Sequence, residues 1–109
     1  MKRGQAVYKN KCVSCHMANG KGIPRAFPPL AESDYLMSDV KRSIDILLNG
    51  LNGKITVNGV LYNGSMIPYK SSLSNKEIAD VLNYIRNSWG NSGDFIKEKT
   101  IDIARKVKN

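Results

Sequence analysis

Residues Cys12-Val13-Ser14-Cys15-His16 form a C-x-x-C-H sequence near the start of the chain. Two thiols three residues apart lie on one helical turn, so each can add to one of the two vinyl groups of a single porphyrin. The next residue then presents an imidazole nitrogen to the iron. C-x-x-C-H is the attachment signature of a c-type haem. The stretch therefore predicts one haem c, covalently bound through Cys12 and Cys15, with His16 as an axial ligand.

Other sites that contain a C-x-x-C pair fit this chain less well. A redox dithiol usually accompanies a βαβ pattern, which the sequence lacks. A zinc site needs two further soft ligands, but the chain has two Cys and one His in all. A disulfide between Cys12 and Cys15 stays an open alternative. Haem attachment is favoured because the signature is specific and its competitors lack partners.

The length of 109 residues predicts one domain. Aromatic residues make up only 7% of the chain, so a bound macrocycle would supply much of the apolar centre. No apolar run is long enough to span a bilayer. The start, Met1-Lys2-Arg3, is not a secretory signal. Because covalent haem is fitted outside the cytoplasm, we expect a periplasmic or otherwise extracytoplasmic protein whose signal peptide or preceding domain is absent from this chain.

The net charge is +8, from 17 basic and 9 acidic side chains. A basic face speeds encounter with an acidic partner. Nucleic acid is the other usual partner, but the lysines do not form a stripe with interleaved aromatic residues. We therefore expect an acidic redox protein or a respiratory enzyme as partner, no nucleic acid, and a monomer. The basic residues expected near the exposed haem edge are Lys9, Lys11, Lys21, Arg25 and Lys70.

The period of apolar residues predicts helices over 2–14 and about 38–49. In the first, Gly4 and Tyr8 share the face that carries Cys12. A glycine inside a helix lowers its stability, so close approach of another helix would account for Gly4. Fraying of the chain end is the alternative reason.

The clearest helix begins after Ser74-Asn75-Lys76-Glu77, which has the form of a capping box. Helical spacing of apolar residues then continues to Trp89, and Gly90 ends the run. This helix is the expected partner of Gly4 and Tyr8.

The other segments change period or lose it. Gly and Pro residues predict an irregular chain over 17–37 and a loop over 63–72. Between them, Asn58-Gly59 is a type I′ turn signal and predicts a two-stranded hairpin near 54–62. Residues 92–109 form a basic tail, either a fourth helix packed on the domain of residues 1–91 or an extension from it. In this tail, the residues expected on one apolar stripe are Ile96, Ile103 and Val107.

The sixth position of the iron decides between electron transfer and chemistry on a small ligand. With no second His, the candidates are methionines. Met17 follows His16 directly and cannot reach the opposite face of the ring. Met37 precedes a helix and fits the core. Met66, flanked by Gly64 and Pro68, is favoured as the axial ligand, and a loop methionine that fills a gap is the alternative.

With these residues placed, positions 2–90 resemble the class I cytochromes c. The resemblance implies an all-α cytochrome c fold, three to four helices wrapped around one haem, in which Gly4 and Tyr8 cross a terminal helix at Val81 and Tyr84. It also implies a proline whose carbonyl accepts the second ring N–H of the axial His. The residues that match this proline and the leucine that packs on the haem are Pro28 and Leu30.

A narrower likeness is to haem c domains of copper nitrite reductases and to alcohol dehydrogenase cytochrome subunits. The stretches that carry it include Pro28-Pro29-Leu30-Ala31, Tyr62-Asn63-Gly64-Ser65-Met66 and Trp89-Gly90-Asn91. The chain departs from these domains at Ile67, which separates the methionine from Pro68.

The resulting hypothesis is a one-electron carrier of the respiratory chain with His/Met ligation, not an enzyme. One alternative is an electron-relay domain of a larger enzyme such as a nitrite reductase. Another is a gas-binding or catalytic haem protein, which would follow if Met66 did not ligate. The absence of a second His or other evident acid–base group counts against catalysis.

Overall fold

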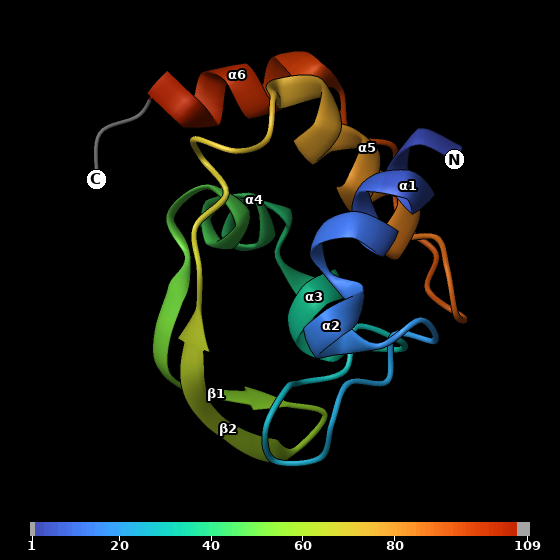
Figure 1. Ribbon diagram of the computed structural model, residues 1–109, viewed down its shortest axis with the longest axis vertical. Helices are drawn as coiled ribbons and strands as arrows, with labels where there is room; N and C mark the ends of the chain where they lie inside the picture. The colour runs from blue at the N-terminus through green and yellow to red at the C-terminus, as the bar shows by residue number, and fades with distance from the viewer. Residues whose placement is uncertain (1, 107–109) are drawn as a thin grey trace.

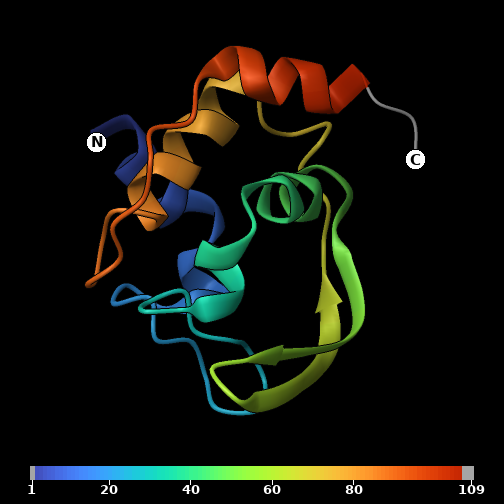
Figure 2. The ribbon, with the colours of Figure 1, turned by 180° about the vertical axis from the view of Figure 1, so that it is seen from behind.

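Six helices and one β-hairpin make up residues 2–106, the part of the chain that the computed structural model describes. In chain order the elements are α1 (Lys2–Lys11), α2 (Val13–His16), α3 (Asp34–Ser38), α4 (Val40–Asn49), β1 (Leu51–Val57), β2 (Val60–Met66), α5 (Asn75–Ile85) and α6 (Glu98–Lys106). Helices α1 and α5 lie side by side, α6 crosses above α4 and α5, and the hairpin curves around the side opposite α1 (Figures 1 and 2). The predicted mostly helical fold with a small hairpin is confirmed, with α2 and α3 as two additional short helices.

The helix predicted over 2–14 is interrupted at Cys12. Helix α1 ends at Lys11, and α2 begins at Val13 and reaches His16. The backbone N–H of Cys12 still donates to Tyr8 O (2.9 Å), and that of His16 donates to Cys12 O (2.9 Å). The interruption therefore leaves these backbone groups paired, and residues 12–16, with both cysteines and the histidine, form one short turn.

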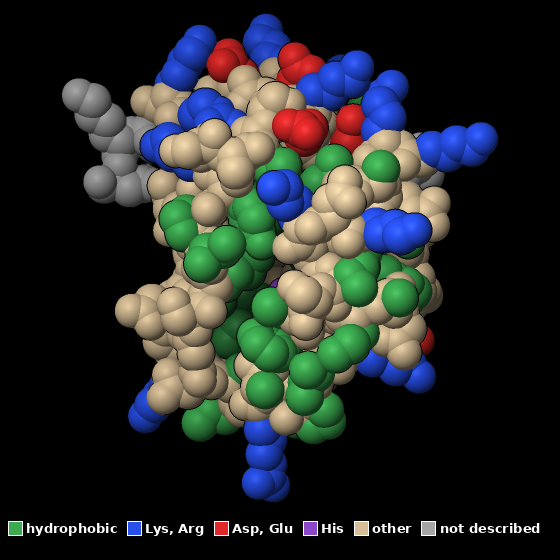
Figure 3. Space-filling model, viewed as in Figure 1, with side chains coloured by type: hydrophobic (Ala, Val, Ile, Leu, Met, Phe, Trp, Pro, Cys, Tyr) green, Lys and Arg blue, Asp and Glu red, His purple; other side chains and the backbone are tan. Residues whose placement is uncertain are grey.

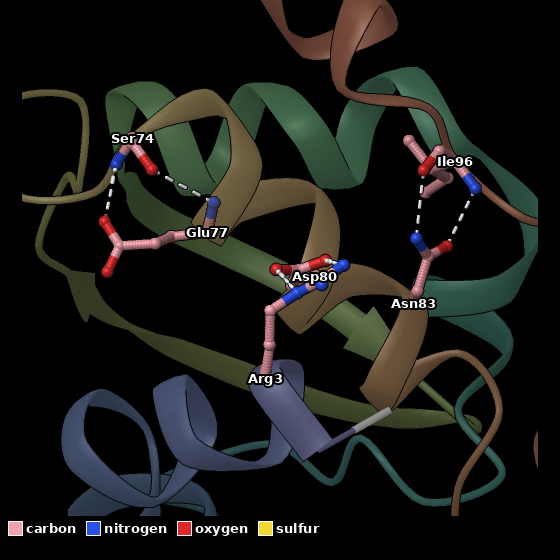
Figure 4. Close-up of polar contacts among 6 residues, drawn as sticks. All are labelled: Arg3, Ser74, Glu77, Asp80, Asn83 and Ile96. Atoms are coloured by element: carbon pink, nitrogen blue, oxygen red, sulfur yellow. Dashed lines mark hydrogen bonds and ion pairs between the residues drawn. The ribbon is translucent and has the colours of Figure 1, made fainter.

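Gly4 accounts for the close crossing of α1 and α5. A Cβ atom at Gly4 would lie 2.1 Å from the carbonyl oxygen of Asp80 and 2.7 Å from Cβ of Tyr84. Beside the crossing, Nε of Arg3 donates to Oδ2 of Asp80 (2.9 Å; Figure 4). Tyr8 is buried at the same contact. Close approach of a helix, rather than fraying, is thus the reason for a glycine at position 4.

The N-terminus of α5 has the predicted capping box. The N–H of Glu77 donates to Oγ of Ser74 (3.1 Å), and the N–H of Ser74 donates to Oε1 of Glu77 (2.9 Å; Figure 4). The predicted end at Trp89 is wrong, because α5 ends at Ile85 and Trp89 has a φ of 51°. Trp89 instead packs its ring against Tyr8, with the ring centroids 5.1 Å apart.

The hairpin is longer than predicted. Its strands pair from Leu51 with Met66 to Val57 with Val60, around the expected Asn58-Gly59 turn, where φ is 50° and 81°. Met66 is therefore the last residue of a strand and does not lie within a loop. The turn is tied to α3, because the N–H of Asn58 donates to Oδ1 of Asp34 (2.7 Å) and the N–H of Asp34 donates to Oδ1 of Asn58 (2.9 Å).

Helix α3 lies in the segment predicted to be irregular. The one local sequence feature that favours this helix is its N-cap: Oγ of Ser33 accepts from the N–H of Leu36 (3.0 Å). Five residues give too little apolar periodicity to indicate a helix. The leucine of α3 is nevertheless buried in the core.

The tail folds back onto the protein as α6. The predicted apolar stripe is wrong at Ile103, which is 56% exposed, whereas Ile101 is fully buried. The prediction assumed that one helix begins before Ile96. Helix α6 begins at Glu98, so Ile96 lies in the segment before it. Ile96 is buried there as expected, and Val107 lies outside the described residues.

The core lies between α1, α4, α5 and α6. Its buried apolar side chains are Tyr8, Leu36, Ile44, Leu47, Leu48, Tyr69, Leu73, Ile78, Ala79, Val81, Leu82, Ile85, Ile96 and Ile101. None of the helices within residues 2–106 is both long and apolar enough to cross a membrane.

Candidate haem site

A cavity of about 280 Å³ opens between α2 and the concave side of the hairpin. A second cavity of about 90 Å³ shares several of its wall residues and extends toward α4 and α5. Figure 3 shows the hollow at the surface, with hydrophobic side chains around its walls. The residues that line both cavities are Cys12, His16, Pro28, Leu51, Ile55 and Met66. The two cavities therefore share part of their walls and are mainly apolar, as a planar apolar cofactor requires.

Both cysteines lie at this cavity, and neither is in a disulfide. Burial, and secondarily the neighbouring Cys15, raises the pKa of the free Cys12 thiol to about 11. Dithiol redox enzymes need the opposite shift, because the thiolate is their nucleophile. The described residues also contain no cluster of His, Cys, Asp and Glu that could hold a metal ion. Within residues 2–106 no side-chain cluster supports a zinc site, and the burial of Cys12 does not favour the thiolate that a redox dithiol needs.

His16 is 8% exposed and its ring is held from one side. Nδ1 of His16 lies 2.9 Å from the carbonyl oxygen of Pro28, and because a carbonyl only accepts, Nδ1 carries the proton. Burial lowers the pKa of His16, and the hydrogen bond to Pro28 opposes that shift in part. A neutral ring protonated at Nδ1 keeps the lone pair of Nε2 free for a metal ion.

The loop that carries Pro28 is folded tightly against α2. The N–H of Gly22 donates to the carbonyl oxygen of His16 (3.0 Å). Gly22 has a φ of 66°, and a Cβ atom there would lie 2.2 Å from the carbonyl oxygen of Phe27. Leu30 follows in the same loop, donates its N–H to Gly20 O (2.6 Å), and lines the smaller cavity. A glycine at position 22 thus lets the loop bring Pro28 to the imidazole.

Met66 lies on the hairpin wall of both cavities, whereas His16 lies on the α2 wall. Gly50 makes room for the backbone here, because a Cβ atom at this position, with φ of 79°, would lie 2.7 Å from the carbonyl oxygen of Met66. Met17 and Met37 line neither cavity. An imidazole, a thioether and two thiols around one cavity are the donor set that fits a covalently bound haem.

Sequence reasoning missed several residues of the cavity wall, among them Leu51, Ile55, Tyr62 and Tyr69. The first three belong to the hairpin. Ile55 and Tyr62 lie within the predicted range 54–62, where only their place on the cavity wall was missed, whereas Leu51 would have been found if the first strand had been extended to 51. Tyr69 follows the hairpin and donates its Oη–H to the carbonyl oxygen of Lys11 (3.0 Å). It thereby ties the segment after Met66 to the end of α1.

The charges are unevenly distributed around the cavity. The walls of the larger cavity come from within residues 11–28 and 51–69, and neither range contains Asp or Glu. In Figure 3 the acidic side chains lie at the top of the view and at its right-hand edge, away from the hollow. Of the five basic residues expected near the haem edge, Lys11 lines the larger cavity, and the other four are exposed.

Comparison with known proteins gives the same assignment. The family model for cytochrome c matches residues 1–89. Cytochrome c-552 of Thermus thermophilus is 44% identical over 93 residues, which cover 82% of this chain and 70% of that protein. The cytochrome c subunit of the quinone alcohol dehydrogenase of Gluconobacter oxydans is 34% identical over 96 residues, which cover 82% of this chain.

A third relative is the gluconate 2-dehydrogenase cytochrome c subunit of Pantoea cypripedii, 33% identical over 92 residues. The matches cover only about a fifth of the length of the two dehydrogenase subunits. The likeness to alcohol dehydrogenase cytochrome subunits expected from the sequence is confirmed. The matched family model and these relatives agree with the C-x-x-C-H turn in its apolar cavity. The chain therefore belongs to the cytochrome c family, as an electron-transfer protein that binds haem c covalently through Cys12 and Cys15.

Proposed function

We propose that His16 and Met66 are the two axial ligands and that the chain carries one electron at a time between respiratory redox partners. The observation that carries the proposal is that these two side chains line the same two cavities, His16 from the end of α2 and Met66 from the end of β2. When bound, the haem supplies an iron that alternates between two oxidation states. Two permanent ligands keep the coordination unchanged in both states, so little reorganisation accompanies each electron.

The chain's own residues tune the site. The carbonyl of Pro28 fixes the ring of His16 and raises its basicity as a ligand. The soft thioether of Met66 favours the reduced metal and raises the potential relative to a second imidazole. Leu30 and the apolar hairpin residues exclude water from the cavity. These residues set the relative stability of Fe(II) and Fe(III), and none of them has to gain or lose a proton to do so.

The charge distribution supports an acidic partner. The wall segments that surround the larger cavity carry Lys11, Lys21, Arg25 and Lys54 and no acidic residue. Such a face steers an acidic redox protein toward the cavity mouth, and the resulting interface is small and short-lived. A monomer that uses this face for successive partners fits the role.

A second candidate is a relay domain of a larger dehydrogenase. It is favoured by the relatives of which this chain covers about a fifth, because their names place them as cytochrome c subunits of dehydrogenases. In either role residues 1–91 form the electron-transfer domain and residues 92–109 an appended basic tail, and the family match to residues 1–89 supports this division. We propose a periplasmic or otherwise extracytoplasmic location, because covalently bound haem c is typically extracytoplasmic.

The experiment is to add carbon monoxide to the reduced holoprotein and record its optical spectrum. The proposal predicts a six-coordinate low-spin spectrum that the gas does not change, because Met66 already fills the sixth position. A high-spin spectrum, or ready binding of the gas, would contradict His/Met ligation and favour the alternative of a gas-binding or catalytic haem protein.

A further inference from the structure

Helix α6 lies beyond the residues that match the cytochrome c family model, and it is fastened to the rest of the protein at both ends. Before its first residue, the side-chain amide of Asn83 donates to Ile96 O (2.9 Å) and accepts from Ile96 N–H (2.7 Å; Figure 4). In its middle Ile101 is fully buried. In its last turn, the guanidinium group of Arg105 forms the second set of hydrogen bonds. All of its acceptors lie in one segment of the chain.

Arg105 binds residues 70–75, which join the Met66 strand to α5. Its Nε donates to Oδ1 of Asn75 (2.6 Å), its Nη2 to the carbonyl oxygen of Leu73 (3.0 Å), and its Nη1 to the carbonyl oxygen of Lys70. Figure 1 shows this segment rising from the end of β2 to the underside of α6. The rigid guanidinium fork thus holds three acceptors that lie four to nine residues after Met66.

The segment 67–74 also has contacts of its own. The N–H groups of Ser72 and Leu73 donate to Tyr69 O (3.2 and 3.0 Å), and Leu73 is buried in the core. Ser74 is held by the capping box of α5. Tyr69 holds its first half, through its N–H to Leu47 O (2.8 Å) and its Oη–H to Lys11 O (3.0 Å). Ile67, directly after Met66, is 65% exposed and adds little packing. Hydrogen bonds from a charged donor are about twice as strong as those between neutral groups. Opening the second half of the segment therefore requires the loss of the Arg105 contacts.

We propose that Arg105 is a positioning residue for Met66: by holding the carbonyls of Lys70 and Leu73 it closes the segment that must open before the thioether can leave the iron. The inference rests on the proposed ligation by Met66. It gives α6 a function in electron transfer, because the tail then sets how easily the sixth ligand is exchanged. A tail that merely adds stability would slow all opening reactions of the protein alike.

The test compares the holoprotein with the variants Arg105→Gln and Arg105→Lys. Lys106→Gln is the matched control, since Lys106 lies next to Arg105 in the chain and, within residues 2–106, its ion pair is with Asp102 one turn earlier on the same helix (3.1 Å). Two quantities are measured: hydrogen exchange of the amides in residues 67–74, and the rate at which added imidazole displaces the sulfur ligand. The unfolding midpoint of each variant in denaturant is measured beside them.

We expect Arg105→Gln to raise the hydrogen-exchange rate of residues 67–74 and the imidazole displacement rate about tenfold. The exchange rate of the α1 amides should change only by the amount that the shift in the unfolding midpoint accounts for. Arg105→Lys should have a smaller effect on both rates, because an ammonium cannot reach three acceptors in a fork. Lys106→Gln should leave both rates as in the wild type. Equal acceleration in the loop and in α1, or no acceleration of displacement, would overturn the proposal.

The same series separates this inference from the ligation on which it rests. If Met66→Leu leaves the sulfur-to-iron band of the wild type unchanged, Met66 is not the ligand and both proposals fail. If that band is lost in Met66→Leu but imidazole displacement is unaltered in Arg105→Gln, the ligation stands and only the role of Arg105 is overturned.

Discussion

The Nδ1 atom of His16 lies 2.9 Å from the carbonyl oxygen of Pro28, twelve residues away in the sequence. This contact fixes the tautomer and the plane of the only imidazole in the chain. It depends on the fold of the intervening loop, because a main-chain carbonyl is placed by backbone conformation alone. The position of His16 is therefore set by the glycines of that loop as much as by α2.

The first prediction concerns the loop that carries Pro28. In Gly22→Ala the new methyl group would meet the Phe27 carbonyl, so the loop must move. The control is Gly59→Ala, which has a similar positive φ but nothing within 4 Å of the new Cβ atom. Gly59→Ala should cost roughly 1–2 kcal/mol from backbone strain alone. Gly22→Ala should cost about 1–3 kcal/mol more.

Chemical denaturation of the two holoproteins measures these costs, and potentiometry follows the ring of His16. We expect a changed reduction potential in Gly22→Ala and an unchanged one in Gly59→Ala. Equal stability losses and equal potentials in the two variants would show that the close approach at Gly22 does not position Pro28.

The second prediction concerns the crossing of α1 and α5. Gly4→Ala places a methyl group against the backbone of Asp80, so the helices must separate. The loss should be about 1–3 kcal/mol, even though alanine favours a helix more than glycine does. Asn10→Ala is the control for helix propensity, because Asn10 is an exposed position of the same helix α1. Thermal unfolding of both holoproteins checks the difference, and a Gly4→Ala protein as stable as the wild type would contradict a tight crossing.

The third prediction concerns alkaline pH. Burial is the largest cause that raises the pKa of Tyr8 above its usual 10.0, and its Oη–H donates to the carbonyl oxygen of Met17 (2.5 Å). Above pH 10 the unfolded chain loses this proton while the folded protein keeps it, so the folded state binds more protons. The free energy of unfolding should then fall by up to about 1.4 kcal/mol per pH unit for this group.

Tyr8→Phe removes that titration. Its free energy of unfolding should decline less steeply above pH 10 than that of the wild type, although the variant loses about 1 kcal/mol at neutral pH with the hydrogen bond. Denaturant titrations at several pH values from about 8 to 11, a range that includes the usual pKa of tyrosine, provide the comparison. Parallel curves for the two proteins would contradict the assignment of the slope to Tyr8.

The fourth prediction concerns the basic face. Lys11→Gln removes a positive charge at the cavity mouth, so the second-order rate constant with an acidic redox protein should fall several-fold at low ionic strength. Lys99→Gln on α6 is the control for net charge. Stopped-flow measurements should show that the deficit of Lys11→Gln disappears as salt is added. Identical rate constants for the two variants at low salt would argue against docking at the cavity.

The cofactor and its attachment could be predicted from sequence because they depend on five adjacent residues. The contact of α1 with α5 could also be predicted from sequence, since Gly4 and Tyr8 share one helical face. The hairpin turn followed from Asn58-Gly59, whose positive φ values few other residue pairs tolerate. Each of these features is local or periodic.

The features that sequence reasoning missed depend on tertiary structure. The break at Cys12 and the end of α5 at Ile85 interrupt apolar patterns that continue in the sequence. The hairpin extends to Met66 although some of its residues disfavour strands: Gly53 pairs with Gly64. The burial of Ile101 in place of Ile103 follows from where α6 starts, and no residue signal fixes that start.

The central claim is that Met66 completes the coordination of the iron opposite His16. The most direct measurement is the weak sulfur-to-iron charge-transfer band of the oxidised holoprotein in Met66→Leu and in Met37→Leu, two substitutions of the same kind. We predict that the band disappears in Met66→Leu and is unchanged in Met37→Leu. A band that survives in Met66→Leu would contradict the claim, and its loss in Met37→Leu would move the ligand to that residue.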